Sequence, residues 1–285
     1  MSGLLGLPLG ARGSGRARYG RAMALYGEGK LSAAQLEAYR VAAADDRRPP
    51  WQVLQDRGLP PPEDLAPGPG ALIRLLLEEC DRYLASLPGP GVGEIRQLLA
   101  RWGQGALHLP TPRANALVEA HLAPALAAVD GHPGLVGAIA AAAPLLDWIT
   151  YDLYPPAEIG AAFAKGHAYC TLIGADAPVR AEDFDLGIFL IAPHVLYRDH
   201  AHPAPELYAP LTGPHGWRFG PDRPLVEKPA HQPVWNPAHR PHLTKVGPNP
   251  FLCLYGWSKD TALPAYVLPA ADWQALEALR LRDVV

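Results

Sequence analysis

Histidine, glutamate and tyrosine side chains are gathered in one short segment of the chain. Residues 197–208 read YRDHAHPAPELY and include His200, His202, Glu206 and Tyr208. Because residues two apart on a strand point to the same face, His200 and His202 can reach one point inside a sheet. Two imidazoles and a carboxylate suit a borderline divalent ion such as iron(II), zinc or manganese. The segment therefore predicts a metal site and leaves the native metal open.

A fourth metal ligand is expected from further along the chain. His242 follows Pro241 and precedes a predicted strand, which places it well for this role. His239 is the rival, whereas His215 and His231 lie in segments that repeat no ligand pattern. We therefore prefer His242 to His239, and the choice between them stays open at this point.

Aromatic residues around this segment can serve either the core or a pocket. Tyr208 lies two residues after Glu206, and this position favours a functional role over simple packing. Four other aromatic residues are individually typical of core packing. These are Tyr197, Tyr255, Trp217 and Trp257. Together they can line a pocket for a cationic substrate, because aromatic faces attract onium groups.

The elements that must position these residues begin with a helical region, residues 1–150. Ser32 and Gln35 are predicted to form a capping box, and apolar residues recur at helical spacing between Gly70 and Pro88. Further helices are predicted over residues 95–102, 115–129 and 135–148. We expect these helices to form a bundle.

A second region, residues 151–285, carries short aromatic or β-branched segments between Gly, Pro and Asp clusters. Predicted strands cover residues 169–173, 184–191, 206–211, 216–219 and 251–257, and a closing helix covers residues 271–282. Strands at this spacing favour an antiparallel sandwich or barrel. The predicted fold class is therefore α+β, with a helical N-terminal region before a β region that holds the metal site.

Composition excludes some partners. A net charge of −3 over 285 residues gives no basic surface for nucleic acid or an anionic membrane. No apolar run is long enough to cross a bilayer, and the first ten residues lack the features of a signal peptide. Three cysteines, Cys80, Cys170 and Cys253, are far apart and suit buried free thiols. We expect a cytoplasmic protein with a small-molecule substrate.

The ligand spacing resembles the first motif of the cupin superfamily, H-x-H, three or four residues, E, six residues, G. His200, His202, Glu206 and Gly213 match its ligands and its glycine. Positions that depart from the cupin pattern, such as His194 in place of a glycine, serve turns rather than metal binding. The resemblance implies a C-terminal antiparallel β-barrel of the double-stranded β-helix type, closed by the C-terminal helix.

A closer resemblance is to the cupin-type dimethylsulfoniopropionate lyases, and it covers roughly residues 184–260. The intervals that carry it join Tyr197, His200, His202, Glu206, Tyr208, Pro241-His242 and Trp257. The resemblance implies a metal-dependent carbon–sulfur lyase that forms dimethyl sulfide and acrylate by β-elimination. Cupins of this kind often form dimers, so a homodimer is also expected.

The resemblance also implies roles for individual residues. Tyr208 is the candidate base that removes the α-proton, with Tyr197 as second choice or as a substrate-positioning hydroxyl. Trp257, Tyr255 and Trp217 are the candidates for holding the sulfonium end of the substrate. One divalent ion would be held by His200, His202, Glu206 and His242.

Three other functions stay open at this point. A lyase-like cupin can act on another carboxylated substrate, because the ligands and the tyrosine do not fix the substrate. Cupins with three histidines and one glutamate also include iron-dependent dioxygenases, which consumption of dioxygen would reveal. A non-enzymatic module that binds a metal or a ligand is the third alternative.

Overall fold

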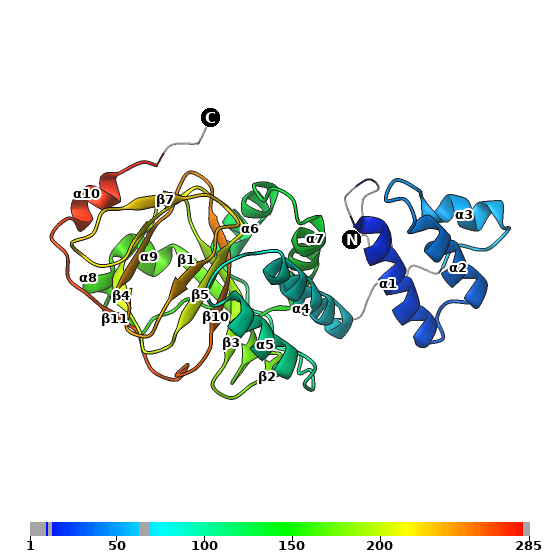
Figure 1. The fold of residues 1–285 in the computed structure, drawn as a ribbon, viewed down its shortest axis with the longest axis horizontal. Coiled ribbons are helices and arrows are strands. Elements are labelled where there is room, and N and C mark those ends of the chain that lie inside the picture. The colour runs from blue at the N-terminus through cyan, green and yellow to red at the C-terminus, as the bar shows by residue number, and fades with distance from the viewer. Residues whose placement is uncertain (1–9, 11–12, 63–68, 282–285) are drawn as a thin grey trace.

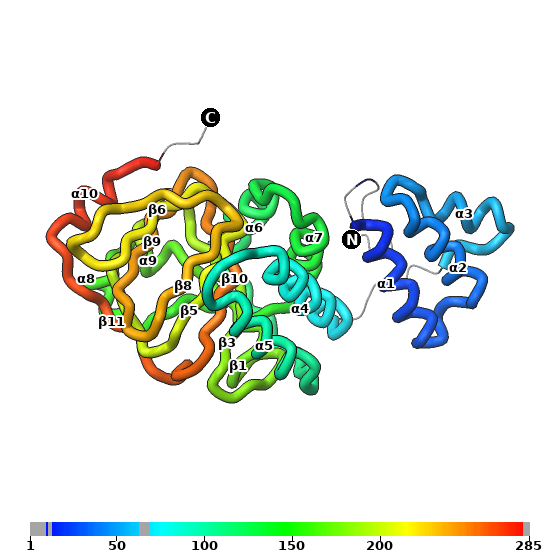
Figure 2. Tube along the Cα trace, in the orientation of Figure 1, coloured from blue at the N-terminus to red at the C-terminus, as the bar shows by residue number. Residues whose placement is uncertain are grey.

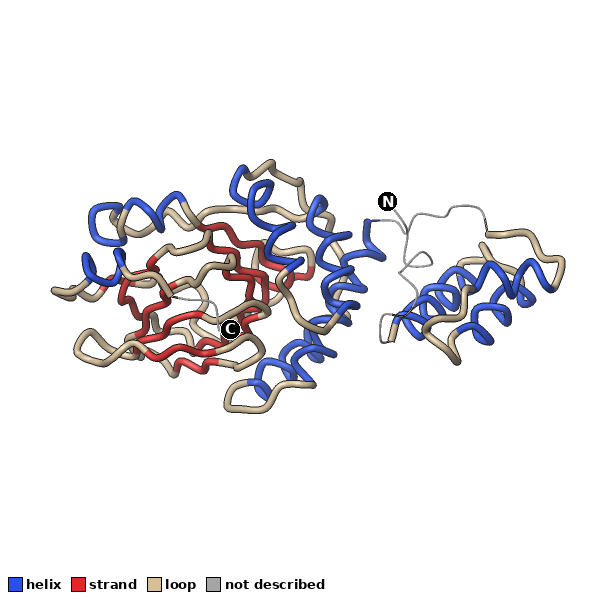
Figure 3. Tube along the Cα trace, turned by 90° about the horizontal axis from the view of Figure 1, so that it is seen from above, coloured by secondary structure: helices blue, strands red, loops and turns tan. Residues whose placement is uncertain are grey.

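The structure is a computed structural model that describes residue 10 and residues 13–62 and 69–281 (Figure 1). The helices are α1 (Ser14–Gly27), α2 (Ala33–Ala42), α3 (Pro50–Asp56), α4 (Pro69–Ala85), α5 (Val92–Trp102), α6 (Ala116–Ala127), α7 (Pro133–Ala142), α8 (Pro156–Ile159), α9 (Ala161–Lys165) and α10 (Trp273–Ala278). A 3-10 turn, η2 (Ala143–Leu145), follows α7. Helices precede and flank two β-sheets, so the predicted mixed helix-and-sheet class is confirmed (Figure 3).

Helices α1–α3 form a group with a hydrophobic core of their own. Leu25, Tyr39 and Leu54 are buried in it. Ser32 Oγ accepts a hydrogen bond from the Gln35 amide at 3.2 Å, and Gln35 Oε1 accepts one from the Ser32 amide at 2.9 Å, which confirms the predicted capping box. The group stands apart from the sheets, beyond α4 and α7 (Figures 1 and 3).

Helices α4–α7 pack on a sheet. The apolar stripe of α4, which includes Ile73, Leu76 and Leu84, shares one buried cluster with Leu172 and Leu254 of the strands. The chain trace shows α4, α5 and α6 running beside this sheet (Figure 2). These helices therefore form a layer on the sheet rather than an independent bundle. The division at residue 150 separates helices from strands but not the hydrophobic core, and as a domain boundary it stays a prediction.

Two predicted helices are shorter in the structure. The predicted helix at residues 135–148 ends at Ala142, and the chain then makes the 3-10 turn that contains Pro144. Proline cannot donate to the preceding turn and so ends a helix. The predicted closing helix at residues 271–282 is only α10, and residue 282 lies outside the described residues.

The strands are β1 (His167–Gly174), β2 (Val179–Arg180), β3 (Asp185–Ile191), β4 (Leu196–Ala201), β5 (Glu206–Pro210), β6 (His215–Arg218), β7 (Val226–Lys228), β8 (Val234–Asn236), β9 (His242–Lys245), β10 (Phe251–Trp257) and β11 (Tyr266–Val267). One sheet has the order β2-β1-β3-β10-β5-β8, and the other has the order β11-β4-β9-β6-β7. Every pairing is antiparallel except that of β1 with β2.

The prediction of a closed barrel is wrong, because the strands form two separate sheets of six and five strands. The strands at the four edges, β2, β8, β7 and β11, are only two or three residues long. Pro178 and Pro233 directly precede two of them, and a proline lacks the N–H that would extend a ladder. Short edges of this kind end a sheet instead of closing it.

Alternation along β10 assigns the two faces of the larger sheet. Leu252 and Leu254 belong to the cluster under the helices, whereas Cys253 and Tyr255 belong to a second cluster that includes Trp217 of the smaller sheet. The second cluster is rich in aromatic residues and lies between the two sheets. The candidate site is built on this inner face.

Two further expectations concern the state of the cysteines and the presence of membrane-spanning helices. Cys80, Cys170 and Cys253 are buried and unpaired, as the sequence predicts. No helix in the described part of the chain is both long and apolar enough to cross a membrane. Cytoplasmic location stays a prediction.

Candidate metal centre and adjoining cavity

Three histidines from the smaller sheet converge on one point. His200 on β4 lies directly opposite His242 on β9, and His202 follows the end of β4. One ring nitrogen from each of the three lies within 4.8 Å of the other two. All three side chains are buried, with at most 3% of their surface exposed. The convergence that the H-x-H spacing predicts is therefore present in the structure.

Backbone carbonyls orient all three rings. The Nδ1 atoms of His200, His202 and His242 lie 2.8, 2.7 and 2.8 Å from the carbonyl oxygens of Arg198, Ala204 and Arg240. A carbonyl only accepts hydrogen bonds, so each Nδ1 carries its proton, and Nε2 is the nitrogen left to face the cluster. Second bonds of this kind typically fix a metal-binding histidine.

The inward-facing nitrogens meet no N–H or O–H donor of the protein, although Nε2 of His202 and Nε2 of His242 lie 3.2 Å from the Glu206 carboxylate. Nε2 of His200 and Nε2 of His242 are buried and make no hydrogen bond. Burial, reinforced by the neighbouring His242 and His202, holds the pKa of His200 well below its usual range, so its ring stays neutral. Buried acceptors without partners are costly, and a cation among them would satisfy their lone pairs.

Glu206 at the start of β5 borders this cluster. Its Oε2 lies 3.2 Å from Nε2 of both His202 and His242, and its Oε1 accepts a hydrogen bond from Trp257 Nε1 at 2.8 Å. Burial opposes ionisation of Glu206, but the two histidines outweigh it and hold the pKa well below its usual range. Three imidazole nitrogens and one carboxylate form a donor set that fits a divalent transition metal.

The rival fourth ligand lies elsewhere. His239 is exposed, and its Nδ1 lies 3.4 Å from the Tyr266 hydroxyl. His215 bonds Thr212 and the Gly247 amide, and His231 contacts Tyr83, so neither belongs to the cluster. The geometry favours His242 as the fourth ligand.

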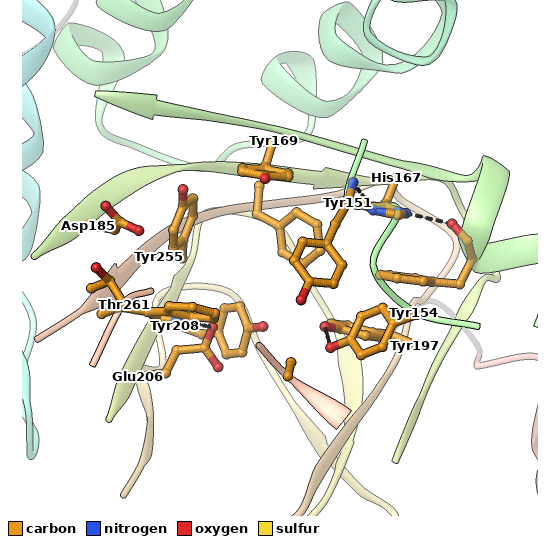
Figure 4. A pocket seen from close by; sticks show the side chains of 14 residues that line it. Tyr151, Tyr154, His167, Tyr169, Asp185, Tyr197, Glu206, Tyr208, Tyr255 and Thr261 are labelled. Carbon is orange, nitrogen blue, oxygen red and sulfur yellow. Dashed lines mark hydrogen bonds between the residues drawn. The ribbon is translucent and has the colours of Figure 1, made fainter. Parts of the chain in front are cut away.

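An aromatic cavity adjoins the cluster (Figure 4). Its volume is about 170 Å³, below the roughly 300–1,000 Å³ of drug-sized pockets, so it suits a small molecule. It is lined by Tyr151, Tyr154, Phe163, His167, Tyr169, Asp185, Phe189, Tyr197, Glu206, Tyr208, Tyr255, Trp257, Thr261 and Ala265. Glu206 and Tyr197 connect the cavity with the histidines: Glu206 contacts two of them, and Tyr197 stacks on His200 with ring centroids 3.8 Å apart.

The structure separates the predicted aromatic residues into two groups. Tyr208, Tyr197, Tyr255 and Trp257 line the cavity. Trp217 does not; it is fully buried behind Tyr208, with ring centroids 5.6 Å apart, and therefore packs the core. Burial, followed by the charge of Glu206, raises the pKa of Tyr208 well above its usual range.

Several lining residues were not predicted from the sequence. Tyr154 donates to or accepts from the Tyr197 hydroxyl at 2.7 Å, and the two hydroxyls face the cavity together (Figure 4). Asp185, Tyr151, Tyr169 and His167 were also missed. Tyr154 stands before two prolines in a connecting segment, where local spacing carries no signal. The strand pattern places Asp185 at a strand start but does not show that it faces a cavity.

Comparisons with known proteins agree on one family. The model of the dimethylsulfoniopropionate lyase family matches residues 94–253, from α5 to β10. A protein of Cereibacter sphaeroides named as a candidate dimethylsulfoniopropionate lyase, DddL, is 29% identical over 126 residues, which are 44% of this chain and 51% of that protein. The chain thus spans about half the length of the curated relative that it matches.

Two solved structures share the fold. A chain from the crystal structures of the DMSP lyases RdDddP and RnDddQII aligns with a TM-score of 0.58 and 21% identity, over 71% of this chain and all of that one. DMSP lyase DddQ from Ruegeria pomeroyi DSS-3 aligns with a TM-score of 0.51 and 22% identity, over 69% of this chain and 95% of that one. With a family match that covers more than half of its residues, this chain belongs to the dimethylsulfoniopropionate lyase family.

Proposed function

We propose that this protein is a metal-dependent lyase that cleaves dimethylsulfoniopropionate to dimethyl sulfide and acrylate. The observation that carries the proposal is a buried histidine cluster with unsatisfied Nε2 atoms beside a small aromatic cavity, in a chain of this family. The expected double-stranded β-helix barrel corresponds here to the two facing sheets.

His200, His202, Glu206 and His242 would hold the metal. When bound there, a divalent ion would supply Lewis-acid stabilisation of the substrate carboxylate and of negative charge at the α-carbon. The four side chains are already oriented for this task, by three backbone carbonyls and by the indole N–H of Trp257. The identity of the metal stays open, because this donor set suits iron(II), zinc and manganese.

Tyr208 is the proposed general base. In β-elimination the base takes the α-proton, and the electron pair of the broken C–H bond forms the α,β double bond. Dimethyl sulfide leaves from the β-carbon with the electrons of the C–S bond. Tyr208 lines the cavity, and the register of β5 places it two residues from Glu206 on the same face. Because burial and Glu206 raise its pKa, its ionisation requires positive charge nearby.

Tyr197 is proposed as a positioning hydroxyl. Its oxygen already forms a 2.7 Å hydrogen bond with Tyr154, and its ring is stacked between His200 and Phe163, with centroids 3.8 and 3.9 Å away. A ring held on both faces can fix a substrate oxygen in place.

Trp257 and Tyr255 are proposed to hold the sulfonium end. Both line the cavity, and aromatic faces attract cations. Trp217 has no such role in the proposal, because it lies outside the cavity wall. A homodimer stays a prediction.

Headspace gas chromatography tests the proposed reaction. Purified protein loaded with iron(II), manganese or zinc is given dimethylsulfoniopropionate, and dimethyl sulfide and acrylate are measured. We expect equal amounts of both products, abolished by a chelator and restored by the metal. Metal-loaded protein that releases neither product would overturn the proposed reaction, and uptake of dioxygen with this substrate would favour a dioxygenase.

A further inference from the structure

The substrate proposed above is a zwitterion, and one acidic residue of the cavity, Asp185, has no role in the reaction as proposed so far. Two carboxylates line the cavity, Glu206 and Asp185. The Glu206 carboxylate contacts His202 and His242 and accepts a hydrogen bond from Trp257. Among the described residues, none forms a hydrogen bond or ion pair with the Asp185 carboxylate, and no lysine or arginine lines the cavity.

The strand register fixes where Asp185 lies relative to the metal cluster. Asp185 on β3 is directly opposite Trp257 on β10, and Trp257 is directly opposite Glu206 on β5. Two strand spacings therefore separate Asp185 from Glu206, roughly 10 Å between their Cα atoms. This separation suits a short zwitterion whose carboxylate lies at the cluster and whose cation lies toward Asp185.

Aromatic rings surround the Asp185 end of the cavity. Tyr255 stands beside Asp185, and Tyr169 lies on the far side of Tyr255 from Asp185 (Figure 4). The rings of Tyr169 and Tyr255 meet edge to face with centroids 6.2 Å apart, and Tyr255 is held by a 2.9 Å hydrogen bond to Thr171. A carboxylate next to aromatic faces presents both negative charge and ring quadrupoles to a cation.

Two glycines make room for these side chains. A Cβ at Gly187 would lie 2.6 Å from the Tyr255 ring, and a Cβ at Gly174 would collide with Asp185 Oδ1. Glycine in a strand often marks a place where another group must approach closely. The positions of Asp185 and Tyr255 are therefore built into strands β1 and β3.

We propose that Asp185 is the counter-ion for the cationic end of the substrate and so selects onium carboxylates over neutral carboxylates. This inference rests on the proposed function of the same cavity. Burial, reinforced by Asp183, raises the pKa of Asp185 to about 6, so the carboxylate is mostly charged at neutral pH. A buried carboxylate without a partner is costly, and a bound cation offsets that cost.

The test compares two ligands of the same shape. Dimethylsulfoniopropionate carries a sulfonium, whereas 4-methylpentanoate has a neutral CH group in its place. In metal-loaded Asp185→Asn, we expect KM for dimethylsulfoniopropionate to rise roughly tenfold to a hundredfold, as loss of a close charge pair predicts. The inhibition constant of 4-methylpentanoate should stay within about twofold, and kcat should change much less than KM.

Asp183→Asn is the matched control. Asp183 is two residues away, is exposed, and has a φ of 53°, a left-handed conformation that asparagine tolerates well. Its carboxylate accepts a hydrogen bond from the Thr261 amide, which an asparagine oxygen can also accept. This variant removes one nearby charge outside the cavity wall, so we expect KM to change less than threefold.

The outcomes separate this inference from the proposed reaction. If the wild-type protein releases no dimethyl sulfide, the same comparison is made by calorimetry with both ligands, and selective loss of sulfonium binding in Asp185→Asn still supports the counter-ion. Equal weakening of both ligands, or the same effect from Asp183→Asn, overturns it. Normal turnover with an unchanged KM in Asp185→Asn also overturns it, while leaving the lyase reaction intact.

Discussion

Two sets of buried histidines in this protein differ in how their second ring nitrogen is satisfied. His167 bonds the Phe163 carbonyl through Nδ1 at 2.6 Å and accepts from the Tyr151 amide on Nε2 at 3.0 Å. His215 likewise bonds Thr212 Oγ1 at 3.2 Å and the Gly247 amide at 3.1 Å. In the cluster, by contrast, the Nε2 atoms of His200 and His242 have no hydrogen-bond partner.

The difference shows what separates a structural histidine from a candidate ligand. All of these rings are buried, and burial lowers the pKa of His167 to about 4 and that of His215 to about 3. Burial and a low pKa therefore do not identify a ligand. Lone pairs that lack a donor and also converge on one point do, because such a group needs a cation or a water; His231 Nε2 is likewise buried without a partner but lies outside the cluster.

The largest expected effect comes from His242→Ala. Removing one of the three imidazoles should lower metal content sharply and reduce lyase turnover by more than about 1,000-fold, as expected when a metal that activates the substrate is lost. His239→Ala is the matched control, three residues away and exposed. Metal analysis and turnover of the two variants check this; retained metal in His242→Ala, with loss in His239→Ala, would exchange their roles.

Tyr208→Phe should separate proton removal from metal binding. The variant keeps the ring that packs against Phe189 and Trp217 but lacks the hydroxyl. We expect a loss of turnover of about 100- to 10,000-fold, the usual contribution of a general base, with one metal retained per chain. A fully active, metal-loaded variant would contradict the base assignment. Tyr197→Phe serves as the comparison and should cost less.

Trp257→Phe should have a smaller effect on the cluster. It removes the N–H that donates to Glu206 Oε1 while keeping an aromatic face toward the cavity. Loss of a second bond to a metal-binding residue typically lowers metal affinity by about 10- to 100-fold. Trp273→Phe removes a comparable N–H from Asp199, whose carboxylate pairs with Arg218 and not with the cluster histidines, and should leave affinity unchanged. Competition with a chromogenic chelator measures both affinities.

The smallest functional effect is expected from His215→Ala. Two hydrogen bonds are lost, so the free energy of unfolding should fall by about 1–3 kcal/mol, while metal content should stay at the wild-type level. Denaturant unfolding with metal analysis checks this. Loss of metal without loss of stability would contradict the division between the two sets of histidines.

The same variant should change the pH dependence of stability. The pKa of His215 is about 3 in the folded protein, and an unfolded histidine has a pKa of about 6.5, so the unfolded chain binds the extra proton between these values. Stability from this group is complete above about pH 6.5 and falls as pH decreases, by about 1.4 kcal/mol per pH unit. Between pH 7 and 5, the free energy of unfolding should therefore change less with pH in His215→Ala than in the wild type. An equal change in the two proteins would contradict the assignment.

Local spacing made much of the site predictable. His200, His202 and Glu206 stand within seven residues: strand periodicity puts the two histidines on one face, and the turn at Pro203 and Pro205 brings the carboxylate back toward them. His242 lies forty residues after His202, and its place depends on the pairing of β9 with β4, whereas the preference for it rests on the Pro241-His242 context before a predicted strand. The preference for His242 over His239 agrees with that pairing.

Features that depend on the packing of distant segments were not predictable. Tyr154 reaches the site from a proline-rich connection, and Asp185 faces the cavity because of its register opposite Trp257. Trp217 was predicted at the substrate but packs behind Tyr208, since spacing cannot tell a core aromatic residue from a lining one. The two open sheets in place of a closed barrel follow from short edge strands that the sequence pattern does not reveal.

Titration with cobalt(II) under anaerobic conditions, followed by assay of dimethyl sulfide release, tests the central claim most directly. The visible absorption of cobalt reports binding to the imidazole nitrogens. We predict one cobalt per wild-type chain, no tight binding in His200→Ala, unchanged binding in His215→Ala, and dimethyl sulfide only from the proteins that bind metal. Wild-type protein that binds no metal, or His200→Ala that binds metal and releases dimethyl sulfide as the wild type does, would contradict the assignment of the unsatisfied histidine cluster as the metal centre of the lyase.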